Sequence, residues 1–179
     1  MVFTVLSLLA ILVGTVIELV PAFLSDSFAS ADPSSANAAL YRKIKPYTAL
    51  ELQGRDIYVR EGCYVCHSQQ VRPTEAEFLR YGEPSKIEES MYDHPFQWGS
   101  KRTGPDLARE GGRYPDSWHF RHMIDPRSVT QGSNMPAYRH LLTSRVDYSR
   151  TQDKIRALRA IGVPYQEAQA VSAERDART

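Results

Sequence analysis

The chain has 179 residues and a formal net charge of +1. This length suits one domain with its own hydrophobic core plus appendages. The nearly balanced charge excludes the strongly basic face that nucleic-acid binding requires, so we expect no nucleic-acid partner.

The first 24 residues differ in composition from the rest of the chain. Residues 2–24 are mostly apolar and contain a single charged side chain, Glu18. A helix of this length spans roughly 35 Å, which is enough to cross a bilayer. We therefore predict a transmembrane anchor at residues 1–24. A signal peptide cleaved after residues 29–31 is the alternative, although the apolar run is long for one and no basic residue precedes it.

A linker and a first domain helix follow. Residues 25–46 include a stretch rich in Ser, Ala and Asp, which predicts an extended linker. Thr48 is followed three residues later by Glu51, the spacing of a capping box, so we predict a helix that begins there. Apolar residues at near-helical spacing carry this helix to about residues 60–62.

The two cysteines of the chain lie in the run Cys63-Tyr64-Val65-Cys66-His67. The C-x-x-C-H spacing is that of covalent c-type haem attachment, in which each thiol forms a thioether and the histidine ligates the iron. A zinc ribbon would need a second C-x-x-C, and a thioredoxin-like pair would need a βαβ pattern. A disulfide or two free thiols remain the simpler alternatives. We predict one covalently bound haem c.

Residues 68–102 are polar and contain three prolines, which predicts a long irregular insertion. The run Thr103-Gly104-Pro105-Asp106-Leu107 follows it. An axial imidazole needs a hydrogen-bond acceptor on its other nitrogen, and the Pro105 carbonyl can accept from His67 Nδ1. Leu107 is then expected to pack on the haem face.

A second strong-field iron ligand is expected on the other haem face. Met135 is the best candidate, because it lies in a turn-rich Gly-Ser-Asn-Met-Pro run that lets the backbone pass close to the haem. Bis-histidine ligation is the main rival. The other downstream candidates are Met91, Met123, His94, His119, His122 and His140.

Two more helices are predicted in the second half of the chain. A middle helix capped by Asp116 or Ser117 stops before Pro126. A last helix begins near Thr151 and stops at Gly162 and Pro164, with its apolar face formed by Ile155, Leu158 and Ile161. A polar tail at residues 166–179 is expected to fray.

These runs together resemble a class I cytochrome c, which implies an all-α domain at residues 47–165. In that fold the first and last helices cross, so the resemblance implies a contact between Gly54 and Tyr58 and the apolar face of the last helix. Cys63, Cys66, His67, Met135, Pro105 and Leu107 would then surround the haem.

Longer runs are similar to one membrane family in particular. They are residues 61–73, 92–107, 111–114, 125–127 and 156–165, together with Trp118. The family is the mono-haem subunit (CcoO or FixO) of cbb3-type cytochrome c oxidase, and the resemblance departs only at the N-terminus, which lacks a charged lead-in before the anchor.

This resemblance implies a single-pass protein of the bacterial inner membrane with its haem domain on the periplasmic side. It implies electron relay from a di-haem cytochrome c subunit, or a soluble cytochrome c, to haem b of the large haem–copper catalytic subunit. A six-coordinate haem leaves no site for oxygen, so no oxygen chemistry is expected in this chain.

The insertion is then expected to be a docking surface. Residues 98–102 would contact the large subunit, with Lys101 and Arg102 near the haem propionates, and the resemblance also implies a calcium ion at this interface. Surface packing of Trp98 and the two cations is the simpler alternative. Three other functions fit these features: a mono-haem subunit of a nitric oxide reductase, a free periplasmic electron carrier, and a haem sensor. The runs at residues 69–73 and 98–102 argue against the nitric oxide reductase subunit.

Overall fold

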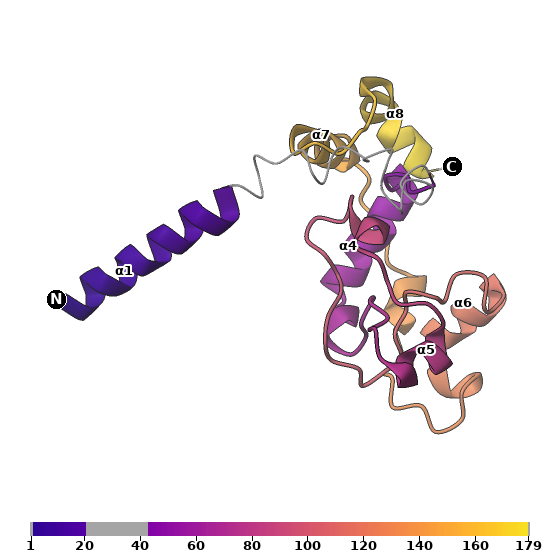
Figure 1. Ribbon diagram of the computed structural model, residues 1–179. Coiled ribbons are helices and arrows are strands. Elements are labelled where there is room, and N and C mark those ends of the chain that lie inside the picture. Colours follow the sequence, from indigo (N-terminus) through magenta and orange to yellow (C-terminus); the bar gives the residue numbers. More distant parts are fainter. Residues whose placement is uncertain (1, 21–42, 179) are drawn as a thin grey trace. The chain divides into compact units, whose positions relative to one another are not determined.

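The computed structural model describes residues 2–20 and 43–178 (Figure 1). Within these ranges all regular secondary structure is helical, which confirms the predicted all-α fold class. The chain divides into two compact units, Met1–Ile44 and Lys45–Thr179.

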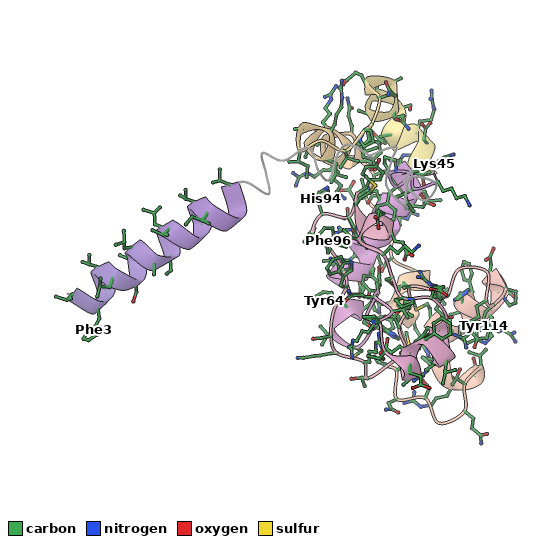
Figure 2. The ribbon with its side chains drawn as sticks, in the orientation of Figure 1. Phe3, Lys45, Tyr64, His94, Phe96 and Tyr114 are labelled. Carbon is green, nitrogen blue, oxygen red and sulfur yellow. The ribbon has the colours of Figure 1, made fainter. Side chains whose placement is uncertain are left out.

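The first unit contains helix α1, Val2–Gly14, which continues into a π-helical turn at Thr15–Leu19. The side chains of α1 are almost all apolar and exposed, as Figure 2 shows around Phe3. Among residues 2–20 and 43–178, no helix combines the length and apolar character that crossing a membrane requires. Residues 21–24 of the predicted anchor, and most of the predicted linker, lie outside the described residues.

The second unit has a helical core at one end, formed by α4 (Ala49–Arg60), α7 (Thr151–Ala160) and α8 (Glu167–Arg178). Helix α8 packs on both α7 and α4 (Figure 1). The core contains apolar side chains from all three helices and from the loop between α7 and α8. Its buried residues are Ala49, Leu52, Ile155, Val163, Tyr165, Ala170, Ala173 and Ala177. The prediction that residues 166–179 fray is therefore wrong, because α8 forms there and buries a row of alanine side chains.

The predicted helix crossing also differs from the structure. Gly54 is exposed, and Ile161 lies beyond the end of α7 with 56% of its surface exposed. Helix α4 instead meets its neighbours through Ala49 and Leu52, roughly one turn earlier. Nearby, the buried Gln53 side chain donates a hydrogen bond to Thr151 Oγ1 at 2.6 Å.

The start and end of α4 agree with the prediction. The Thr48 hydroxyl accepts a hydrogen bond from the Glu51 backbone N–H at 3.3 Å, and the Glu51 carboxylate accepts one from the Thr48 N–H at 2.7 Å. This confirms the capping box. The helix ends at Arg60, and Gly62, with a φ of 73°, turns the chain into a 3-10 turn at Cys63–Val65. A glycine suits this left-handed conformation because it lacks a Cβ.

The segment 68–102 combines irregular backbone with two short helical elements. It contains α5 (Glu75–Tyr81) and a 3-10 turn at Ile87–Ser90. Backbone hydrogen bonds join Gln69 N–H to the Trp98 carbonyl at 2.8 Å and Ser85 N–H to the Val71 carbonyl at 2.9 Å. The segment thus folds back on the chain that follows the cysteines.

Helix α6, Asp116–Ile124, is the predicted middle helix. It ends before Pro126, as expected, but its N-cap is Pro115, so neither Asp116 nor Ser117 caps it. Short 3-10 turns at Pro126–Ser128 and Arg139–Leu142 lie on either side of the Met135 loop.

Candidate functional site

The C-x-x-C-H motif lies directly after the end of α4. The His67 N–H donates to the Cys63 carbonyl at 3.0 Å, so a single turn of backbone holds both cysteines and the histidine together. Both thiols are unpaired and partly buried. Burial raises the pKa of the Cys63 thiol.

The His67 ring is held by a backbone acceptor. Its Nδ1 lies 2.8 Å from the Pro105 carbonyl oxygen, so the predicted hydrogen bond is present. A carbonyl only accepts, so Nδ1 carries the proton, and Nε2 of the neutral ring keeps a lone pair that can bind a metal.

Gly104 explains why the backbone can reach the imidazole. A Cβ at this position would lie 2.3 Å from His67 Cε1, closer than two carbon atoms can approach. The Gly104 N–H also donates to the Cys66 carbonyl at 2.9 Å. The Gly-Pro run can therefore pass close to the ring, and a Cβ at position 104 would force the His67 ring to shift.

A buried carboxylate joins the two chain segments that meet at His67. Asp106 Oδ2 accepts hydrogen bonds from Ser68 Oγ at 2.6 Å, from Gln70 N–H at 2.8 Å and from Arg102 Nη2 at 3.1 Å. Its Oδ1 accepts from Ala108 N–H at 2.9 Å, and its side chain is fully buried. This network fixes the residues that follow His67 against those that follow Pro105.

Arg102 belongs to the same network. Its guanidinium donates to Ser68, Glu77, Asp106 and the Gln70 carbonyl, and its side chain is only 16% exposed. The ion pair with Glu77 raises the pKa of Arg102 and lowers the pKa of Glu77. These contacts account for the buried arginine, and its predicted approach to a haem propionate stays a prediction.

The remaining predicted contact on this side is Leu107. It is partly buried, and its N–H donates to the Ser68 carbonyl at 2.8 Å. The structure thus ties its backbone to the residue after His67, whereas packing of its side chain on a haem stays a prediction.

Helix α6 brings a second group of ligand candidates together. His122 Nε2 lies 3.1 Å from Met135 Sδ. The His122 ring stacks on Trp118, with ring centroids 4.6 Å apart and planes 10° apart. Burial lowers the pKa of His122, and the nearby charges of His119 and His67 lower it further. Met135 and one of the candidate histidines, His122, are therefore in contact.

Other ligand candidates lie in different surroundings. Met91 is buried, Met123 is partly exposed on α6, and His94 is exposed. His140 Nε2 lies 2.9 Å from a carboxylate oxygen of Glu61, with which it pairs on the surface. Within the described ranges, no three His, Cys, Asp or Glu side chains lie together in a way that could hold a metal ion.

Sequence reasoning missed two tyrosines beside the cysteines. Burial raises the pKa of Tyr58, and the nearby Cys63 raises it further. Burial and the two cysteines likewise raise the pKa of Tyr138. Tyr58 lies five residues before Cys63 on α4, where its spacing in the sequence predicts only a role in helix packing.

The side chains present fit a haem. They supply two thiols, an imidazole with an available Nε2, and a thioether. Among the described residues, the buried Tyr58 Oη and His122 Nδ1 have no hydrogen-bond partner within the protein. Buried polar atoms are rarely left unpaired, so both positions are consistent with a further group in this region.

An open depression of about 370 Å³ adjoins the motif, lined by Val59, Tyr64, Pro95, Phe96, Gln97 and Gly99. Tyr64 and Phe96 are 45% and 41% exposed and lie on the same side of the domain (Figure 2). Trp98 stacks on Phe96 at 4.7 Å and donates to Ser90 Oγ at 3.0 Å. Trp98 therefore supports this surface from within.

A comparison with protein families agrees with this site. A family model described as cytochrome c oxidase, mono-haem subunit/FixO, matches residues 1–179. The chain belongs to this family. Membership confirms the resemblance seen in the sequence and makes the chain a mono-haem subunit of cytochrome c oxidase with an electron-transfer role. A search of curated proteins found no match.

Proposed function

We propose that this chain is the subunit of a cbb3-type oxidase that carries one covalently bound haem c and passes single electrons to haem b of the large catalytic subunit. The hydrogen bond from His67 Nδ1 to Pro105, made possible by Gly104, is the observation that carries the proposal. It presents an imidazole nitrogen for iron ligation next to two thiols.

Each side chain of the site has one task. Cys63 and Cys66 would hold the haem through thioethers, and His67 and Met135 would supply a nitrogen and a sulfur ligand for its iron. The haem supplies a reversible one-electron couple when bound. With His67 and Met135 both bound to the iron, no site would remain for oxygen in this chain, and we assign its reduction to the catalytic subunit.

The depression beside the motif is the proposed docking surface. Exposed aromatic and apolar side chains are typical of the centre of a protein interface. Tyr64 stands between the two cysteines, so a partner that covers it comes close to the haem. A di-haem cytochrome c subunit or a soluble cytochrome c is the proposed electron donor. The calcium ion at this interface stays a prediction.

We also propose that the N-terminal segment anchors the chain in the bacterial inner membrane, with the haem domain on the periplasmic side. The exposed apolar side chains of α1 support this role. Replacing residues 1–31 by a new signal peptide should give a soluble haem domain that no longer assembles. Wild-type chain found in the soluble periplasm with Asp32 at its N-terminus would contradict the anchor.

The docking surface is tested with a Tyr64→Ser, Phe96→Ser double variant expressed with the whole complex. A matched control is the Phe120→Ser, Val171→Ser double variant, which changes two exposed apolar side chains outside residues 68–102. We expect the first variant to keep its haem spectrum and to lose co-purification with the catalytic subunit or electron transfer to haem b. Wild-type assembly and turnover in that variant would refute the docking role.

A further inference from the structure

Helix α6 is the platform of the Met135 loop. The Tyr138 N–H donates to the Met123 carbonyl at 2.8 Å, and Arg139 Nε donates to the Ile124 carbonyl at 3.3 Å. Both acceptors belong to the last turn of α6, whose backbone carbonyls lack partners within the helix. The chain after Met135 is thus fixed to α6.

His122 adds a contact to Met135 itself. Its Nε2 lies 3.1 Å from Sδ, a short approach for a bond to sulfur. A thioether has lone pairs and no proton, so the imidazole nitrogen must be the donor. The neutral ring then has a bare Nδ1, and this atom is buried without a hydrogen-bond partner among the described residues. The Nε2–H tautomer is the one that satisfies the contact.

The orientation of the imidazole is fixed by stacking. Trp118 lies against His122 with planes 10° apart, and Tyr114 lies against Trp118 with centroids 4.1 Å and planes 13° apart. His119 packs edge-on against Trp118 at 5.2 Å. Tilting the His122 ring would give up its stacking, so the ring keeps Nε2 directed at the sulfur.

We propose that His122 is a positioning residue for Met135, whose thioether sulfur it holds through an Nε2–H hydrogen bond that raises the reduction potential of the haem. The inference rests on the proposed function, in which Met135 ligates the iron. A hydrogen bond draws electron density from the sulfur and makes it a poorer donor to the ferric ion than to the ferrous ion. Contacts to a metal's ligands tune the metal in this way.

The test measures the midpoint potential of the haem in the full-length chain within the purified complex. His122→Phe removes the donor and keeps a ring for Trp118 to stack on, whereas His122→Gln keeps an N–H donor. Phe120→Leu is the control, since it changes an exposed aromatic side chain of the same helix. We expect a lower potential in His122→Phe, a potential closer to wild type in His122→Gln, and an unchanged one in the control.

The near-infrared spectra of two variants distinguish failure of this inference from failure of the proposed function. The near-infrared charge-transfer band of Met–Fe(III) ligation should persist in His122→Phe and disappear in Met135→Ala. A His122→Phe protein with this band and the wild-type potential would overturn the inference and leave Met135 as ligand. Loss of the sixth ligand in His122→Phe, with the spectrum unchanged in Met135→Ala, would make His122 the ligand and overturn both.

If the His122→Phe protein does not accumulate with haem, NMR of the wild-type chain tests the inference instead. In the diamagnetic reduced protein, nitrogen NMR reports which ring nitrogen of His122 is protonated. We expect a proton on Nε2 and none on Nδ1. The opposite tautomer, or a doubly protonated ring, would overturn the inference.

Discussion

The two sides of the proposed haem site are built differently. On the His67 side, a buried carboxylate and several backbone hydrogen bonds join residues 66–70 to residues 102–108. On the Met135 side, a largely exposed loop is held to α6 by contacts at a few points. We infer that the attachment side is rigid and tied to folding, whereas the Met135 side can tune the haem without destabilising the fold.

The largest effect on stability is expected from Asp106→Ala. This change leaves Arg102, Ser68 and the Gln70 N–H without their buried acceptor. Removing one partner of a buried ion pair costs about 3–5 kcal/mol. Urea unfolding of the haem-loaded protein measures the loss, with Asp153→Ala, an exposed change on α7, as control. If the two variants lost equal stability, the attachment side would not depend on this network.

Gly104→Ala tests how tightly the His67 side of the site packs around the imidazole ring. The new Cβ would overlap the His67 ring and force it away from Pro105. Overpacking of this kind costs about 1–3 kcal/mol, and we expect part of the chain to lose normal axial ligation as well.

Gly111→Ala is the matched control for that variant, because a Cβ there meets no atom within 4 Å among the described residues. Absorption spectra and urea unfolding compare the two. A Gly104→Ala protein with the wild-type spectrum and stability would show that the ring has more room than the structure gives it.

Met135→Ala should change the haem spectrum and the reduction potential more than it changes the stability of the fold. We expect the near-infrared Met–Fe(III) band to disappear and the potential to fall, because Met/His ligation keeps it high. The free energy of unfolding should drop less than in Asp106→Ala, since the loop around Met135 is largely exposed. An unchanged spectrum would point to Met91, Met123 or a histidine as the sixth ligand.

The smallest effect concerns the hydrogen-bonded pair that links the two sides, Glu61 with His140. Hydrogen bonds from His140 first, and from Arg60 second, lower the pKa of Glu61. A carboxylate with a lowered pKa stabilises the folded state above its unfolded pKa, and this contribution is lost as the pH falls through the folded value. Glu61→Gln should therefore unfold slightly more easily than wild type at neutral pH.

That difference between Glu61→Gln and wild type should shrink as the pH falls through the lowered pKa of Glu61, because below it the carboxylate is protonated in both folded and unfolded chains. Urea midpoints of the two proteins at neutral and at acid pH measure it. A difference that persisted unchanged in acid would mean that the pair does not act through the charge of Glu61.

Features that depend on local chemistry could be predicted from the sequence. The capping box at Thr48 and Glu51 needs only two side chains three residues apart, and the structure contains it. The hydrogen bond from His67 to Pro105 joins residues distant in sequence, but a haem-ligating imidazole requires an acceptor and a Gly-Pro run exposes one.

Features that depend on distant neighbours were missed. Helix α8 alternates small and charged residues, so its sequence looks like a polar tail until α4 and α7 cover its alanines. Arg102 was expected at a docking surface near the haem propionates, and nothing local in the sequence shows that Glu77 lies beside it. The expected contact at Gly54 came from the general cytochrome c fold, and here the helices meet at Leu52 instead.

The central claim is that Cys63 and Cys66 hold a haem covalently, and mass spectrometry of the denatured full-length chain tests it most directly. The account predicts the mass of the polypeptide plus one haem, with the peptide that contains both cysteines carrying the group through two thioether bonds. The mass of the unmodified polypeptide, from a chain purified out of an intact oxidase complex, would contradict the account.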